Sequence, residues 1–190
     1  MRALLQRVSR ASVAVDGGSI ASIGPGLLLL LGVGHGDDDA VTDGLARRAT
    51  ELRIFRDEEG RTNRSILDIG GAALVVSQFT LYADTACGRR PGFTNAAPPE
   101  LANRLYLRFA DQLRANGVAD VQTGSFGTEM AVELVNDGPF TIWLDTGDRP
   151  AVPLSSTAGL WSDRTETGED YVERVRPGRL ASLQEKRRGG

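Results

Sequence analysis

Residue types that often carry enzyme chemistry are nearly absent from this sequence. Its 190 residues include one histidine, His35, one cysteine, Cys87, and one lysine, Lys186. A lone cysteine forms no internal disulfide and supports no cysteine-rich zinc site. A Ser-His-Asp triad would have to use His35, which stands between two glycines and is better explained as a turn residue. The sequence therefore predicts neither a metal centre nor a serine-hydrolase triad.

Nucleotide-binding glycine motifs are also missing. Residues 32–36 (Gly-Val-Gly-His-Gly) match neither a GxGxxG fingerprint nor a P-loop. The acidic run at residues 37–39 has two interpretations, a divalent-cation site or the first turn of a helix, and helix capping accounts for it. No cofactor is expected. If the chain is an enzyme, its catalysis must rely on backbone groups, hydroxyl groups or the substrate itself.

Long hydrophobic segments are absent. The longest apolar run, residues 27–33 with one glycine, is far shorter than the ~20 residues that span a bilayer. Polar residues interrupt the first seven positions, where a signal peptide needs an apolar core. We therefore expect a cytoplasmic protein with no membrane partner. The net charge of −3 argues against broad nucleic-acid affinity but leaves room for a local basic patch.

Hydrophobic patterns predict strands and two helices in the first 144 residues. Apolar residues at helical spacing place one helix at about 38–53 and a second from Pro98 to Asn116. Residues 55–65 are polar and predicted to be a loop, and residues 83–99 form a long loop of the kind that is often functional. The predicted strands are residues 2–15, 19–23, 27–33, 72–76 and 118–122, and the run 27–33 is typical of a strand buried on both faces.

Residues 135–141 (Val-Asn-Asp-Gly-Pro-Phe-Thr) have two interpretations. β-Forming residues on both sides, at 130–135 and 140–144, predict a hairpin whose turn is Asn-Asp-Gly-Pro. Alternatively, the Gly138–Pro139 peptide shapes a ligand site. Local turn chemistry favours the hairpin.

The chain is predicted to have one domain, residues 1–146, and a polar extension, residues 147–190. From residue 174 onward the extension has six basic residues and one acidic residue, a local charge of +5. Such a segment is either a solvated tail or an electrostatic arm for nucleic acid.

Two segments, read with the start of the chain, resemble the D-aminoacyl-tRNA deacylase family. They are residues 77–81 (Ser-Gln-Phe-Thr-Leu), which follow a buried strand, and residues 136–141 (Asn-Asp-Gly-Pro-Phe-Thr). Residues 6–13 (Gln-Arg-Val-Ser-Arg-Ala-Ser-Val) match as well. The resemblance extends from residue 1 to about 144. Each segment alone is a weak signal, whereas their order and spacing together are specific.

The resemblance implies an α+β fold, a compact body of antiparallel β-sheets with two main helices. It implies an enzyme that hydrolyses the ester of D-aminoacyl-tRNA, and of mischarged glycyl-tRNA, as chiral proofreading in translation. The partners implied are the 3′-terminal adenosine of aminoacyl-tRNA with its amino acid, and a second copy of the chain in a homodimer.

Chiral selection is assigned by the resemblance to Gly138 and Pro139. Their peptide bond should be cis and should enter the site of the partner subunit, where two carbonyl oxygens receive the substrate ammonium. An L side chain would collide with this backbone. Arg7 matches the arginine that holds the turn, although a surface ion pair is the alternative for a strand arginine.

Catalysis is assigned to the segment that begins at Ser77. Ser77, Gln78 and Phe79 match residues that line the adenosine and ester pocket, where backbone N–H groups stabilise an oxyanion. Thr80 is the candidate nucleophile or water-positioning group, although no base stands at a recognisable position to activate it. The resemblance also implies that the ribose 2′-hydroxyl of the tRNA assists hydrolysis. Phe126 matches a pocket aromatic, and an ordinary core phenylalanine is the alternative.

Two positions depart from the family pattern. Phe140 replaces a small β-branched residue, and is expected either to pack on the dimer partner or to reshape the pocket. Gly92 replaces a serine. The alternative to an enzyme is a non-catalytic RNA-binding or dimerisation module that retains the fold. A third interpretation, a general small-ester hydrolase, is disfavoured because the sequence predicts no catalytic triad.

Overall fold

The computed structural model describes residues 1–86 and 88–147, so the predicted extension, apart from Gly147, lies outside the described residues. The elements are β1 (Arg2–Val15), β2 (Gly18–Ile23), β3 (Gly26–Gly32), α1 (Asp39–Glu51), β4 (Phe55–Arg56), β5 (Thr62–Arg64), β6 (Ala72–Ser77), the 3-10 helix η1 (Phe79–Tyr82), α2 (Pro99–Ala115), β7 (Val121–Thr123) and β8 (Ala131–Asp145).

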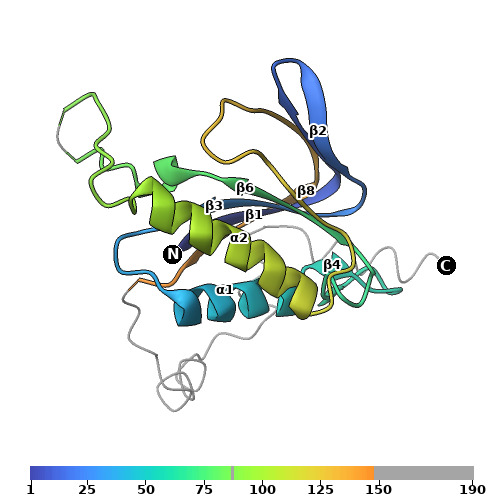
Figure 1. Cartoon of the computed structure of the whole chain (residues 1–190). Coiled ribbons are helices and arrows are strands. Elements are labelled where there is room, and N and C mark those ends of the chain that lie inside the picture. The colour runs from blue at the N-terminus through green and yellow to red at the C-terminus, as the bar shows by residue number, and fades with distance from the viewer. Residues whose placement is uncertain (87, 148–190) are drawn as a thin grey trace, which may run out of the picture. The chain divides into compact units, whose positions relative to one another are not determined.

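The main sheet has the order β2-β1-β3-β6-β7, with β8 paired to β1. Strand β1 is antiparallel to β2, β3 and β8, whereas β3, β6 and β7 run parallel to one another. Parallel neighbours need crossover connections, and α1 and α2 lie in these crossovers (Figure 1). The predicted α+β fold with two main helices is confirmed, and its sheet is mixed because of the three parallel strands.

Strand β3 is buried on both faces, as its unbroken apolar run predicts. Leu27, Leu29 and Leu31 belong to the core cluster that α1 and α2 cover. Leu28 belongs to a second cluster, formed with the far half of β1 and with β2. The helices therefore cover one face of the sheet, and β2 with the second half of β1 packs over part of the other face.

The acidic run before α1 caps that helix. The Asp38 carboxylate accepts a hydrogen bond from the Val41 N–H at 2.8 Å, which is the N-cap arrangement. Asp39 forms an ion pair with Arg104 of α2, and Asp43 one with Arg108, so the two helices are joined along their exposed sides. Helix capping is thus the correct interpretation for Asp38.

The predicted hairpin at 130–144 is wrong, because β8 is a single strand. Its end at residues 141–145 pairs with residues 2–6 of β1, and its start at residues 131–136 pairs with residues 8–14 of the same strand. The ladder breaks opposite Arg7, where residues 137–140 leave the sheet as a bulge. We call residues 137–140 the Gly-Pro bulge. The long edge of β1 aligns both halves, which local turn chemistry does not encode.

Two smaller findings complete the fold. The predicted loop at 55–65 contains the short antiparallel pair β4–β5. Among the helices of the described part, none is both long and apolar enough to cross a bilayer.

Candidate functional site

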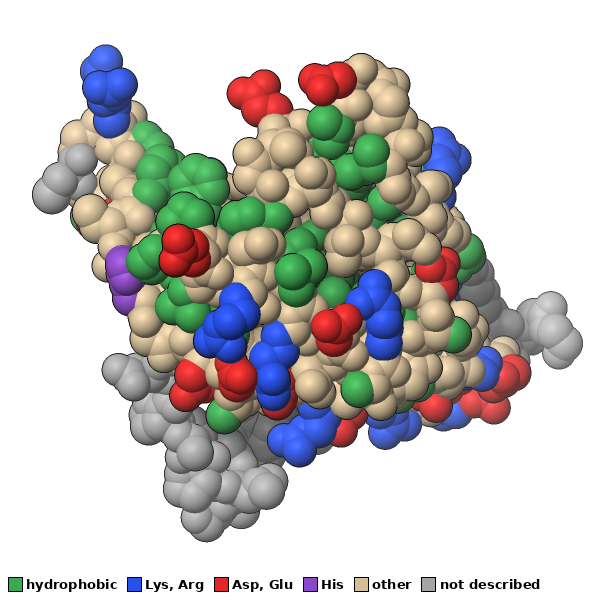
Figure 2. Space-filling model, in the orientation of Figure 1, with side chains coloured by type: hydrophobic (Ala, Val, Ile, Leu, Met, Phe, Trp, Pro, Cys, Tyr) green, Lys and Arg blue, Asp and Glu red, His purple; other side chains and the backbone are tan. Residues whose placement is uncertain are grey.

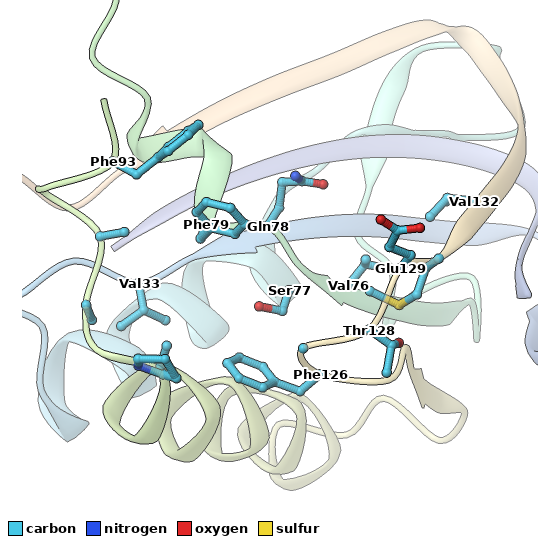
Figure 3. Close-up of a pocket in the computed structure, with 16 residues that line it drawn as sticks. Val33, Val76, Ser77, Gln78, Phe79, Phe93, Phe126, Thr128, Glu129 and Val132 are labelled. Atoms are coloured by element: carbon cyan, nitrogen blue, oxygen red, sulfur yellow. The ribbon is translucent and has the colours of Figure 1, made fainter. Parts of the chain in front are cut away.

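A pocket of about 660 Å³ opens beside the end of β6. Its walls come from β6 and η1, from the loop before α2, from the first turn of α2, and from the loop between β7 and β8. Figure 3 shows Ser77 in the middle, with Phe79 and Phe93 on one side and Glu129 on the opposite side. Glu129 is the one ionisable residue among the described residues that line the pocket. The pocket therefore suits a largely neutral, flat group.

Three of the predicted site residues meet at this pocket because β6 ends there. Ser77 is the last residue of β6, and the Gln78 N–H donates to the Leu31 carbonyl of β3 at 2.7 Å before the chain turns into η1. Phe79, 55% exposed, is held edge-on to Phe93 with ring centroids 5.0 Å apart. The carboxyl end of a parallel strand is a common ligand site.

Thr80 lies beside the pocket without lining it. Its side-chain oxygen accepts a hydrogen bond from the Gln78 amide, and no ionisable group of the described residues bonds to it. The arrangement therefore supplies no general base for a threonine nucleophile. The N–H groups of Phe79 and Thr80 open the 3-10 helix and have no acceptor within it.

Phe126 lines the floor of the pocket and also packs on the core. Its ring lies 5.9 Å from that of Tyr106, whose hydroxyl donates toward the carbonyls of Val75 (2.9 Å) and Gly124 (3.2 Å). Burial raises the pKa of Tyr106 to about 12, so the hydroxyl stays a neutral donor. The same ring therefore lies at the pocket and against the core.

A network that sequence reasoning missed holds η1 against the sheet. The Arg2 guanidinium donates to the Leu81 carbonyl at 2.8 Å, pairs with Asp145 at 3.1 Å, and lies 4.4 Å above the Tyr82 ring. The Tyr82 hydroxyl donates to Asp37 at 3.4 Å, and Asp37 also pairs with the Met1 ammonium. Helix η1 is thus anchored at its far end, next to the residues that line the pocket.

The glycines at 32 and 34 have a packing role in this network. A Cβ on Gly34 would lie 2.7 Å from the Tyr82 hydroxyl oxygen, and one on Gly32 would lie 3.1 Å from the Gln78 carbonyl. The Gly-Val-Gly segment therefore lets η1 approach β3. Glycine has no side chain that contributes to a hydrophobic pattern, so the sequence alone does not indicate this packing role for Gly32 and Gly34.

The Gly-Pro bulge is held by two side chains that pack beneath it. Arg7, 3% exposed, donates through Nε to the Asp137 carbonyl at 2.8 Å and pairs with the Asp137 carboxylate at 3.1 Å. The Asn136 side chain accepts from the Phe140 N–H at 2.7 Å and donates to the Phe140 carbonyl at 3.1 Å. Arg7 is thus a buried support for the bulge, and its interpretation as a surface ion pair is wrong.

The peptide bond between Gly138 and Pro139 is cis, as expected. A Cβ on Gly138 would lie 2.3 Å from the Phe140 nitrogen, so a larger residue does not fit this bulge. The Phe140 ring lies 4.8 Å from the Arg7 guanidinium carbon and packs against the main core. Phe140 does not line the pocket of its own chain, and its packing against a partner subunit stays a prediction.

The bulge and the pocket of one chain do not meet. Gly138 and Pro139 are exposed, and the residues of the bulge are absent from the pocket lining within the described part of the chain. The structure therefore gathers Ser77, Gln78, Phe79 and Phe126 in one place and Arg7, Gly138 and Pro139 in another. The pocket also uses Phe93, Glu129 and Met130, which sequence reasoning missed because they come from irregular loops.

Comparisons with known proteins relate the matched region to one family. The family model described as D-Tyr-tRNA(Tyr) deacylase matches residues 4–145. The "D-aminoacyl-tRNA deacylase" of Paracoccus denitrificans is 60% identical over 149 residues, which cover 78% of this chain and 99% of the relative. The protein of the same name from Thermomicrobium roseum is 62% identical over 148 residues, covering 78% and 96%.

Solved structures show the same fold. "c-Myc DNA Unwinding Element Binding Protein" superposes with a TM-score of 0.74 at 39% identity, covering 78% of this chain and all of that one. "Structural Analysis of a probable eukaryotic D-amino acid tRNA deacylase" matches with a TM-score of 0.66 at 19% identity, covering 75% and 97%. With its fold, its pocket and its Gly-Pro bulge in the matched region, this chain belongs to the D-Tyr-tRNA(Tyr) deacylase family.

Proposed function

We propose that this protein hydrolyses the ester bond of D-aminoacyl-tRNA, and of glycyl-tRNA on the wrong tRNA, releasing the amino acid and tRNA. One observation carries the proposal: a chain about 60% identical to proteins named D-aminoacyl-tRNA deacylase has an apolar pocket at Ser77–Phe79 and a separate, firmly held Gly-Pro bulge. The substrate is made and used in translation, so we place the enzyme in the cytoplasm.

The pocket suits the 3′-terminal adenosine and the attached ester. Phe79, Phe93 and Phe126 offer aromatic surfaces on which a base stacks. The ester would then lie near the start of η1, where the N–H groups of Phe79 and Thr80 are available to a developing oxyanion. Preorganised donors of this kind are worth about 3–4 kcal/mol each in acyl transfer.

The attacking group is water assisted by the substrate. No base reaches Thr80 in the described part of the chain, whereas the ribose 2′-hydroxyl lies next to the ester in every aminoacyl-tRNA. Thr80→Ala should therefore keep substantial single-turnover activity. A folded Thr80→Ala variant without activity would restore the threonine nucleophile.

Chiral selection would come from the Gly-Pro bulge of a second copy. The bulge is exposed and contributes no residue to the lining of its own pocket, so it would act on substrate by entering another pocket. Strand β8 around it exposes Leu134, Val135 and Trp143, which a partner subunit would cover. The carbonyl oxygens of Gly138 and Pro139 would receive the substrate ammonium, and the backbone would exclude an L side chain.

The deciding assay is single-turnover deacylation of D-Tyr-tRNA and L-Tyr-tRNA by the same preparation. Rapid loss of the D ester alone is expected. Equal hydrolysis of both esters, or of neither, would contradict the proposal and favour an RNA-binding or dimerisation module.

Mixing two inactive variants tests whether the bulge works in the partner's pocket. Gly138→Ala disturbs the bulge, and Phe79→Ala removes an exposed pocket ring. After subunit exchange in an equimolar mixture, half of the dimers contain one subunit of each variant. In these mixed dimers one of the two sites has an intact pocket and an intact bulge. The mixture should therefore regain about one quarter of wild-type activity. A mixture as inactive as its components would place the bulge and pocket of each site in one chain.

A further inference from the structure

The pocket described above has no cationic group for the phosphates of a nucleic acid. Glu129 is its one ionisable residue within the described chain, and it is acidic. A tRNA carries one negative phosphate for every nucleotide. If the terminal adenosine fills the pocket, which rests on the proposed function, the following phosphates must lie outside its mouth and meet other residues.

A short loop, residues 88–92, projects from the rim of this pocket. We call it the arginine loop, because it contains Arg89 and Arg90. Its last residue, Gly92, exchanges two backbone hydrogen bonds with Asp84, at 2.7 and 2.8 Å. The next residue, Phe93, lines the pocket and contacts Phe79. The loop is therefore a direct continuation of the pocket wall.

The base of the arginine loop is fixed to the body. The Ala97 N–H donates to the Val33 carbonyl at 2.9 Å, and His35 Nε2 is hydrogen-bonded to the Thr94 carbonyl at 2.9 Å. Figure 1 shows the loop extending beyond the first turn of α2. Arg90 is three residues from Phe93, a chain distance of at most about 11 Å. Its charge is thus held within a few nucleotide lengths of the pocket.

Both arginines are exposed and unengaged. Within the described residues, neither Arg89 nor Arg90 makes an ion pair or a side-chain hydrogen bond. The arginines of α2 differ, since Arg104 and Arg108 are paired with acidic residues of α1. Figure 2 shows positive charge at the tip of the projecting loop and hydrophobic side chains beside it. A guanidinium with five free donors binds phosphate oxygens in bidentate geometry.

We propose that Arg89 and Arg90 bind the phosphates of the nucleotides that precede the terminal adenosine of tRNA. They contact the backbone alone, so they hold the 3′ end in register without reading its sequence. Arg89 and Arg90 supply a local positive charge that attracts phosphate groups, although the net charge of the chain is −3. The chemistry of the ester and the chiral choice remain with the pocket and the bulge.

The test is the salt dependence of tRNA binding by the full chain. The Arg89→Gln/Arg90→Gln variant is compared with wild type and with Arg47→Gln/Arg48→Gln. The latter removes two exposed arginines of α1 that lie outside the pocket lining and form no ion pair with any described residue. Each lost phosphate contact should lower the slope of log K against log salt by about 0.7–0.9. From 50 to 200 mM salt, the loop variant should therefore lose about tenfold less affinity for deacylated tRNA than wild type.

A truncated substrate separates this role from one in the pocket. On the D-tyrosyl ester of adenosine, which has no phosphate, the loop variant should react like wild type, and on D-Tyr-tRNA its KM should rise with an unchanged rate at saturation. A wild-type salt slope, or an equal defect on the truncated ester, would overturn the proposal. The binding slope is measured without turnover, so failure of the proposed deacylation would be seen separately.

Discussion

Replacing Arg7 with methionine should release the Gly-Pro bulge while keeping most of the buried side-chain volume. Arg7 is buried and donates to the carbonyls of Ile54 and Asp137, and Ile54 itself is buried. Leaving the Ile54 carbonyl without a donor costs about 1–3 kcal/mol. The half-exposed Asp137 carboxylate adds about 0–1 kcal/mol, and the lost contact with the Phe140 ring about 0.5–1 kcal/mol.

The sum is about 3 kcal/mol, which lowers Tm by about 6–12 °C for a domain of this size. Because the bulge loses its support, the single-turnover rate on D-Tyr-tRNA should also fall by at least about tenfold. Thermal unfolding followed by circular dichroism, and the deacylation assay at a temperature where both proteins are folded, measure the two effects.

Asp137→Asn is the matched control. It removes the carboxylate charge and leaves the backbone carbonyl that Arg7 holds, so its loss of stability should stay at or below about 1 kcal/mol. An Arg7→Met variant with native Tm and native rate would refute the assignment of Arg7 as the support of the bulge. Equal losses in both variants would assign that role to the ion pair between the buried Arg7 guanidinium and the Asp137 carboxylate.

Three further predictions follow from the structure. Gly26→Ala places a Cβ 1.8 Å from the Ala72 carbonyl oxygen, where β3 pairs with β6. It should lower the free energy of unfolding, measured with denaturant, by several kcal/mol. The control Gly36→Ala has open space around its Cβ and should change this free energy by no more than about 0.5 kcal/mol. Arg2→Gln removes the contacts that hold η1 and should lower the single-turnover rate several-fold. Arg104→Gln breaks an exposed ion pair between the helices and should react like wild type. An Arg2→Gln rate equal to that of wild type would show that Arg2 is not needed to hold η1. Burial raises the folded-state pKa of Tyr106 from 10.0 to about 12. The neutral hydroxyl therefore contributes fully to stability below pH 10, and this contribution is lost as pH rises from about 10 to 12. The unfolding free energy of Tyr106→Phe should accordingly fall less steeply with pH in this range.

Ser77, Gln78 and Phe79 were assigned to the pocket by the family resemblance, and local sequence patterns predicted the strands that position them. Apolar runs located β3 and β6, and the residues after β6 had to leave the sheet where it ends. Phe93 and Glu129 could not be found in this way because they stand in irregular loops. Arg2 was missed because its contacts, Tyr82 and Asp145, lie far along the chain.

The sequence by itself determined the helices, their caps and the strongly apolar strands, because propensity, periodicity and capping act within a few residues. It also carried the Asn-Asp-Gly-Pro chemistry of residues 136–139. Tertiary structure alone decided that these residues form a bulge in one strand. The 14-residue β1 offers a continuous edge, and pairing along it aligns residues 131–136 and 141–145 in one ladder. Backbone hydrogen bonds between segments some 130 positions apart thus overrode the local preference for a hairpin.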